Sequence, residues 1–198
     1  MENGTLIDLI YTNPNSLSLE VCNDMIRLFE EEDNRYAGII TSGLNTQIKD
    51  TTDFIITEGG SRWKRINQLL ANELNNNVIE YVKTCDNMGG DKYHSFGPCM
   101  STMSMQLQKY NKDVGKYVYH NDSLCDFKEK QVRRITFMWY LNNVEEGGET
   151  EFWSKYMIKP TAGKLVLFPA CWTFPHKAKV PTSSDKYIIT GWLWEHFK

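Results

Sequence analysis

The stretch RRITFMWYLNNVEEGGETEF, from Arg133 to Phe152, carries the pattern that decides the fold. Its first part, Arg133 to Leu141, alternates along its length in the way that strands do. Gly147-Gly148 is a turn signal, and Glu149 to Trp153 again has the composition of a strand. The stretch therefore predicts two strands joined by a loop that ends in a glycine turn.

Strands of similar length recur on both sides of this stretch, with turn residues between them. We expect further strands at Met103–Tyr110, Tyr117–His120, Gly163–Phe168, Trp172–His176 and Lys186–Trp194. Many short strands separated by turns are typical of a β-sandwich or barrel. The second half of the chain is therefore predicted to form the β core of the domain.

The first half of the chain predicts two helices. Ser16 or Ser18 can cap a helix that runs to about Asp33, and a second helix is expected over Ser61 to Thr84. Between them, residues 37–57 have a short, β-like pattern. Two helices packed on one face of the strands would complete an α+β domain. We predict one domain over residues 1–198, with a helical part over about 1–100 and the β core over about 101–198.

Composition excludes several classes of protein. Of the 198 residues, 41% are hydrophobic and 24% are charged, and the net charge of −3 is neither polybasic nor that of a disordered acidic chain. The five cysteines include no CxxC pair, which favours reduced thiols over a disulfide framework or a zinc ribbon. The first twenty residues have no secretory signal, and no apolar run is long enough to span a membrane. We expect a soluble cytoplasmic protein.

The sharpest local feature is His120-Asn121-Asp122. On a strand, residues i and i+2 point to the same face, so this imidazole and carboxylate can converge on one cation. By itself an H-x-D triplet is a weak signal, and the alternative is a hydrogen-bonded histidine in the core or at the surface. That alternative is retained for His94 and His196, which have no partner at ligand spacing.

A metal site needs a further ligand, and His176 is the candidate. Two histidines and one carboxylate on one face of an octahedron leave positions open for a cosubstrate and O₂, which suits Fe(II) oxygenases. A cupin-like site that holds another divalent metal is an alternative at this point.

Lys186 follows His176 at the start of a predicted strand. If its side chain faces into the barrel, a buried ammonium requires a partner, and the distal carboxylate of 2-oxoglutarate would provide one. If the side chain faces outward, it is an ordinary exposed lysine. Spacing alone leaves both possibilities open.

Several motifs in a fixed order now point to one family, over about Met103 to Trp194. They are Gln108–Tyr110, Gly115–Asp122, Arg133–Asn142, Val144–Phe152, Ile158–Phe168 and, last, His176 and Lys186. Together they resemble the prolyl 4-hydroxylase-like branch of the 2-oxoglutarate/Fe(II) dioxygenases. The resemblance implies a double-stranded β-helix, which is a jelly-roll or cupin-like barrel. It also implies Fe(II), 2-oxoglutarate, O₂ and ascorbate dependence, with succinate and CO₂ as coproducts.

The resemblance also assigns roles to single residues. It makes His120, Asp122 and His176 the iron ligands, and it pairs Lys186 with the distal carboxylate of 2-oxoglutarate. The remaining positions that match the family are cosubstrate contacts at Tyr110 and Tyr140, the pocket end of the last strand at Thr190 and Trp192, and a substrate contact at Arg133.

The substrate is the part that the sequence defines least. The resemblance implies hydroxylation of a peptidyl proline, but Ser123–Gln131 is short where relatives clamp a peptide, and Phe152-Trp153 replaces a proline found in many relatives. The alternatives are a free amino acid, a small metabolite or a nucleic-acid base, and a catalytically silent binding module. A nucleic-acid partner is not favoured by the net charge, and the sequence makes no prediction of oligomeric state.

Overall fold

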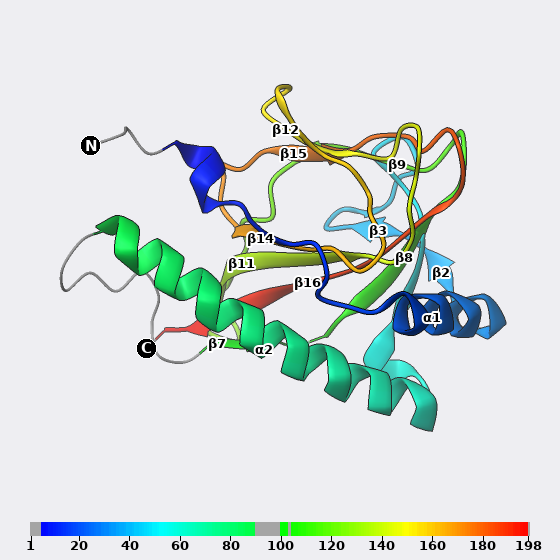
Figure 1. Ribbon diagram of the computed structural model, residues 1–198, viewed down its shortest axis with the longest axis horizontal. Coiled ribbons are helices and arrows are strands. Elements are labelled where there is room, and N and C mark those ends of the chain that lie inside the picture. The colour runs from blue at the N-terminus through cyan, green and yellow to red at the C-terminus, as the bar shows by residue number, and fades with distance from the viewer. Residues whose placement is uncertain (1–4, 90–99, 103, 198) are drawn as a thin grey trace.

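The computed structural model describes residues 5–89, 100–102 and 104–197. His94 and Cys99 lie outside these residues, as does Met103, the first residue of one predicted strand. The described part contains two α-helices, two larger antiparallel sheets and a two-stranded hairpin. Figure 1 shows three layers, with one sheet above the other and the helices below. This arrangement is consistent with a jelly-roll.

Both helices begin at residues that the sequence singled out. Helix α1 spans Leu19–Glu31, and the Ser18 side chain caps it by accepting a hydrogen bond from the Val21 amide. Helix α2 spans Ser61–Gly89 and is therefore longer than predicted at its C-terminal end. Two short 3₁₀ turns, η1 at Leu6–Leu9 and η2 at Ile56–Glu58, precede β1 and α2. No helix in the described part of the chain is long and apolar enough to cross a membrane.

The major sheet has nine strands, all in antiparallel pairs. Two of them lie beside the main path, because β10 (Cys125–Asp126) pairs with β11 and β7 (Met100–Thr102) pairs with β16. The main path runs β1 (Tyr11–Asn13), β14 (Leu165–Pro169), β11 (Gln131–Tyr140), β16 (Lys186–His196), β8 (Gln106–Tyr110), β6 (Thr52–Ile55) and β2 (Tyr36–Ala37).

The minor sheet has five strands and carries much of the candidate site. Its order is β13 (Tyr156–Ile158), β12 (Thr150–Phe152), β15 (His176–Ala178), β9 (Lys116–His120) and β5 (Lys49–Asp50). A separate hairpin pairs β3 (Ile39–Ile40) with β4 (Gly43–Leu44). The N-terminal hundred residues therefore supply strands to both sheets in addition to the two helices.

From Ile135 to Tyr140, strand β11 is buried on both faces, which differs from the alternation that its sequence suggested. Phe137 and Trp139 pack into the core shared with α1 and α2, whereas Met138 and Tyr140 pack into a second core beneath the minor sheet. A strand covered on both faces is apolar on both, so alternation between polar and apolar residues disappears.

One predicted strand is misplaced. The segment Trp172–His176 is not a strand that ends at the histidine, because β15 begins at His176. A turn precedes it, closed by the hydrogen bond from the Phe174 amide to the Cys171 carbonyl, and Trp172 is 76% exposed. Aromatic residues favour strands, but here tertiary context places one of them at the surface.

Candidate active site

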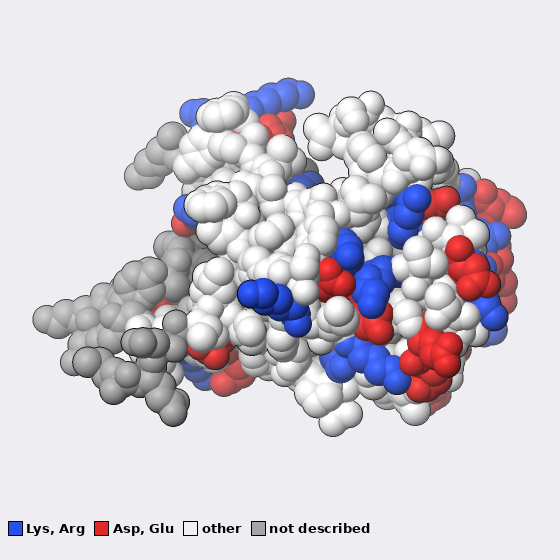
Figure 2. All heavy atoms as spheres, turned by 90° about the horizontal axis from the view of Figure 1, so that it is seen from above, with Lys and Arg blue, Asp and Glu red and all other residues white. Residues whose placement is uncertain are grey.

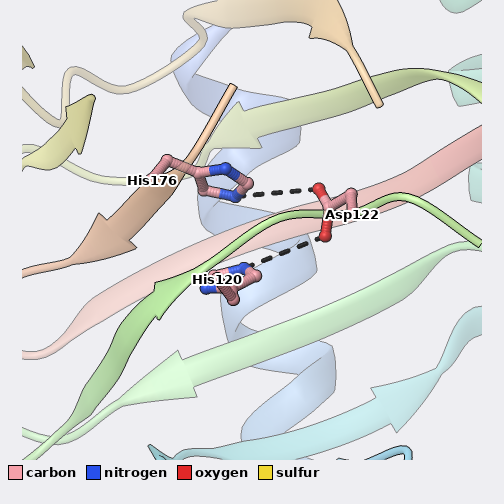
Figure 3. Close-up of side chains that lie close together, drawn as sticks. All are labelled: His120, Asp122 and His176. Carbon is pink, nitrogen blue, oxygen red and sulfur yellow. Dashed lines mark ion pairs between the residues drawn. The ribbon is translucent and has the colours of Figure 1, made fainter. Parts of the chain in front are cut away.

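Three side chains converge between the two sheets (Figure 3). His120 is the last residue of β9, Asp122 follows it, and His176 is the first residue of β15, directly opposite His120 in the strand pairing. The two Nε2 atoms lie 3.8 Å (His120) and 3.6 Å (His176) from the Asp122 carboxylate oxygens. One ligand atom from each residue can be chosen so that all lie within 4.8 Å of one another. The strand pairing thus brings together residues that are far apart in the sequence.

Backbone carbonyls fix the orientation of both imidazoles. The Nδ1 atom of His120 lies 2.8 Å from the Val118 carbonyl, and that of His176 lies 3.0 Å from the Phe174 carbonyl. Since a carbonyl can only accept, each Nδ1–H donates, and each Nε2 keeps its lone pair for the site. This is the arrangement that protein metal ligands adopt.

The charge states of His120 and Asp122 suit a divalent cation. Burial, together with the neighbouring His176, lowers the pKa of His120 to about 4. Burial alone would raise the pKa of Asp122, but the two histidines and the hydroxyl of Thr136, which donates over 2.8 Å, bring it below its usual range. At neutral pH a neutral His120 therefore lies beside an ionised Asp122.

Aromatic side chains hold the two rings in place. Tyr117 stacks on His120 with the ring centroids 3.5 Å apart and the planes 13° from parallel. On the other side, Phe168 and Phe152 contact the ring of His176 at centroid distances of 4.9 Å and 5.4 Å. These contacts exclude water from one side of each imidazole and restrict its rotation.

The convergent residues line a cavity of about 350 Å³, and Lys186 lies on its wall. Only 1% of Lys186 is exposed, so of the two orientations left open by the sequence the inward one is found. Its Nζ donates to the Gly148 carbonyl over 3.0 Å and lies 4.0 Å from the centre of the Tyr110 ring. Burial lowers the pKa of Lys186 to about 7, although Glu149 opposes this shift.

Tyr110, Thr190, Trp192 and Arg133 also line the cavity, as the predicted roles require. Tyr140 does not. It is fully buried behind the wall, and its hydroxyl donates to the Thr150 hydroxyl over 2.6 Å. The sequence placed the Tyr140 hydroxyl next to a cosubstrate, whereas in the structure Thr150 stands between the tyrosine and the cavity.

Arg133 is held by aromatic rings. Its guanidinium carbon lies 3.5 Å from the ring centre of Trp192 and 5.0 Å from that of Trp194. The Nε of Arg133 and the indole Nε1 of Trp192 are buried without a hydrogen-bond partner among the described residues. Two buried polar donors near this part of the cavity wall are thus without a partner in the described part of the chain.

Several cavity residues were not singled out from the sequence. Tyr117 and Thr136 contact the candidate ligands, and Lys49 enters from the N-terminal strand β5. Thr136 could have been found from strand alternation, because residues two apart in a strand point to the same face. Thr136 therefore shares a face of β11 with Met138, which also lines the cavity. Lys49 gave no such signal, since it lies in a two-residue strand.

The sequence profile of the 2OG-Fe(II) oxygenase superfamily matches residues 105–194, which include all three convergent residues and Lys186. The matched region is a little less than half of the chain. Together with the convergent residues, this match supports the assignment of the protein as a 2-oxoglutarate/Fe(II) dioxygenase. No curated protein matches the chain.

Solved structures of similar fold include three prolyl hydroxylases. A viral collagen prolyl hydroxylase from Paramecium Bursaria Chlorella virus-1, in complex with 2-oxoglutarate, matches with a TM-score of 0.65 and 19% identity, over 94% of this chain and 96% of that one. A Pseudomonas putida prolyl-4-hydroxylase matches with a TM-score of 0.69 and 16% identity, over 94% and 93%. A Trichoplax adhaerens prolyl hydroxylase, in complex with a hypoxia inducible factor peptide, matches with a TM-score of 0.69 and 18% identity, over 94% and 83%. At these identities the likeness establishes the fold of this dioxygenase.

Proposed function

We propose that this dioxygenase hydroxylates an unactivated C–H bond with iron held by His120, Asp122 and His176. The observation that carries the proposal is the convergence of two Nε2 lone pairs and one carboxylate in a buried cavity. Two histidines and one carboxylate are the donor set of non-haem Fe(II) oxygenases. The donors fit the ion, because the only carboxylate in the set is ionised and each Nδ1–H is already bonded to a carbonyl.

We propose that Lys186 binds the distal carboxylate of 2-oxoglutarate. Its ammonium is buried, and its one hydrogen-bond acceptor in the described part of the chain is the neutral Gly148 carbonyl. A buried ammonium without a carboxylate partner is costly, and an incoming dianion removes that cost. When bound, the iron and 2-oxoglutarate supply the oxidising power that hydroxylates the substrate with release of succinate and CO₂.

The proposed substrate is a peptidyl proline, and ascorbate dependence is part of the same proposal. The three solved structures compared above are prolyl hydroxylases, which supports this choice by analogy alone. The same analogy supports a double-stranded β-helix core. We treat residues 1–198 as one unit because strands from both halves pair in both sheets. A free amino acid or small metabolite is the main alternative.

A nucleic-acid base is less well supported. On the face seen in Figure 2, basic and acidic side chains lie next to one another over the described residues. Ion pairs such as Lys177–Glu151 and Lys179–Glu149 belong to the minor sheet and the loop that leads into it. A surface of alternating sign differs from the continuous basic surface that binds a phosphate backbone.

The first test is Asp122→Ala. The wild-type protein with Fe(II) should convert 2-oxoglutarate to succinate, slowly even without substrate, and the variant should lose both metal binding and succinate formation. His196→Ala is the matched control, since this exposed histidine contacts Ser101 and not the cavity. A variant that keeps full turnover would show that the iron ligands are misassigned. A panel of proline peptides and free amino acids, scored by the mass gain of one oxygen, then identifies the substrate class.

A further inference from the structure

A second lysine lies buried on the cavity wall, far from Lys186 in the sequence. Lys49 of β5 is 4% exposed, and its Nζ lies 2.6 Å from the Oδ2 of Asp53 in β6, which is 1% exposed. The Thr51 hydroxyl donates to the other carboxylate oxygen of Asp53 over 2.7 Å. Lys49 lines the cavity and Asp53 lies behind it. The pair is therefore a built feature of the wall and not a surface ion pair.

The pair lies next to the candidate iron ligands. Strand β5 pairs with β9 so that Lys49 is opposite Tyr117, and the Lys49 Nζ lies 5.7 Å from the centre of the Tyr117 ring. That ring stacks directly on His120. A molecule bound over the iron site is thus within reach of the Lys49 ammonium.

The Lys49 ammonium has more N–H donors than acceptors around it among the described residues. It carries three N–H groups, and Asp53 is its one hydrogen-bond acceptor among the described side chains and backbone. A buried donor without an acceptor costs about 1–3 kcal/mol. A ligand that displaces water from this wall must therefore present an acceptor to Lys49.

The charge of that acceptor follows from Asp53. Lys186 faces a neutral carbonyl and needs an anion, whereas the charge of Lys49 is already balanced by a carboxylate. A second carboxylate next to Asp53 would place two like charges around one ammonium. A neutral oxygen can accept from Lys49 without that repulsion.

Asp53 also orders the neighbouring part of the wall. The Gln108 amide donates to Asp53 over 3.5 Å and to Gln106 over 3.2 Å, and the Gln108 carbonyl accepts from the Tyr110 hydroxyl over 3.1 Å. Since a carboxylate can only accept, Asp53 fixes which end of the Gln108 amide faces it. The polar atoms on this wall are thereby held in one orientation.

We propose that Lys49 is a specificity-determining residue that donates to a neutral carbonyl oxygen of the substrate, and that Asp53 sets this preference by balancing its charge. The substrate class is then one that presents an amide carbonyl at this wall, as a peptide does, and not one that presents a carboxylate there. The inference rests on the proposed hydroxylase function and deepens it.

The experiment compares N-acetyl-L-prolinamide with N-acetyl-L-proline, which differ in presenting a neutral amide or a carboxylate. Dissociation constants are measured by calorimetry on protein loaded with Mn²⁺ and 2-oxoglutarate without O₂. The wild type should bind the amide more tightly. In Lys49→Met/Asp53→Asn, which is neutral, close in shape and without a donor at position 49, the Kd for the amide should rise about tenfold, as expected for one lost charge-assisted hydrogen bond. The Kd for 2-oxoglutarate should not change.

Lys109→Met/Glu30→Gln is the matched control. It makes the same chemical change at an ion pair that joins β8 to α1 on the other face of the major sheet, and it should leave both constants unchanged. A single Asp53→Asn change leaves the ammonium unbalanced and should shift the preference toward the carboxylate probe. Thermal unfolding of each variant verifies that it is folded.

Three outcomes overturn the inference: a wild type that prefers the carboxylate probe, a wild type that binds neither probe, and a double variant that binds the amide as well as the wild type. None of them affects the conversion of 2-oxoglutarate to succinate, which depends on the iron ligands and Lys186. Failure of this inference is therefore distinguishable from failure of the proposed hydroxylase function.

Discussion

The cavity wall contains two buried lysines, and the groups around them differ. On the side formed by β16 and β8, Lys186 lies among groups that do not neutralise it by direct contact. On the side formed by β5 and β6, Lys49 is paired with Asp53 at 2.6 Å. On the first side the Lys186 ammonium needs an anion. On the second side Asp53 balances the charge of Lys49, but the Lys49 ammonium has N–H groups without an acceptor among the described residues. Burial of a cation therefore does not by itself predict an anionic ligand.

The largest expected effect concerns stability and tests whether the two lysines differ in this way. Asp53→Leu leaves Lys49 buried without its partner and should lower the free energy of unfolding by about 3–5 kcal/mol. Lys186→Met removes an ammonium that has no carboxylate in contact, so the free energy of unfolding should change by less than about 1 kcal/mol. Urea unfolding of the protein without metal or 2-oxoglutarate measures both. Equal destabilisation by the two changes would contradict the comparison.

Local signals were sufficient to predict most elements of the fold. The cap at Ser18, the start of α2 at Ser61 and strand β16 all follow from patterns within a few residues. The misplaced strand before His176 shows the limit of such patterns, since the composition of that segment favours a strand but its neighbours leave Trp172 at the surface. Composition describes what a segment can form, and packing decides what it does form.

The candidate site likewise contains residues that the sequence predicted and residues that only the packing reveals. His120, Asp122, His176 and Lys186 were accessible because several motifs around them occur in the fixed order of one family, whereas the H-x-D triplet and the spacing of Lys186 are weak signals by themselves. The Lys49–Asp53 pair was not accessible, since β5 has only two residues and its place beside Tyr117 depends on pairing across 68 positions, from 49 to 117. The layer behind Thr150 in which Tyr140 lies was not accessible for a related reason, because it is set by side-chain packing.

A smaller effect concerns pH and sharpens the description of the Lys186 side. Burial lowers the pKa of Lys186 to about 7 against the opposing effect of Glu149, and the other groups facing it are the Tyr110 ring and the Gly148 carbonyl. Only the protonated amine pairs with a carboxylate, so binding above about pH 7 takes up a proton. The Kd for 2-oxoglutarate should therefore rise by up to about tenfold per pH unit.

The lowered pKa of Lys186 also makes the stability of the protein depend on pH. The folded pKa of Lys186 lies below the unfolded one, so the protein without 2-oxoglutarate should lose stability as the pH falls from about 10 to 7. Calorimetric titration with 2-oxoglutarate and Mn²⁺ over this range measures the binding effect. Lys186→Arg is the control, because arginine stays protonated and should give a nearly constant Kd. A wild-type Kd that does not depend on pH would show that Lys186 keeps its proton without the anion.

The smallest effect tests whether the metal end of the cavity depends on the β11 wall. Thr136→Val removes the hydroxyl that donates to the Asp122 carboxylate over 2.8 Å while preserving the shape of the side chain. Outer hydrogen bonds of this kind orient a metal ligand, so the affinity for Mn²⁺ should fall about tenfold, or about 1.4 kcal/mol. Competition with a chelator measures the affinity. Thr136→Ser keeps the hydroxyl and should restore most of it, whereas equal losses in both variants would assign the effect to packing and not to the hydrogen bond. Because the Lys49 and Lys186 sides contribute no metal ligand, neither of their variants should alter this affinity.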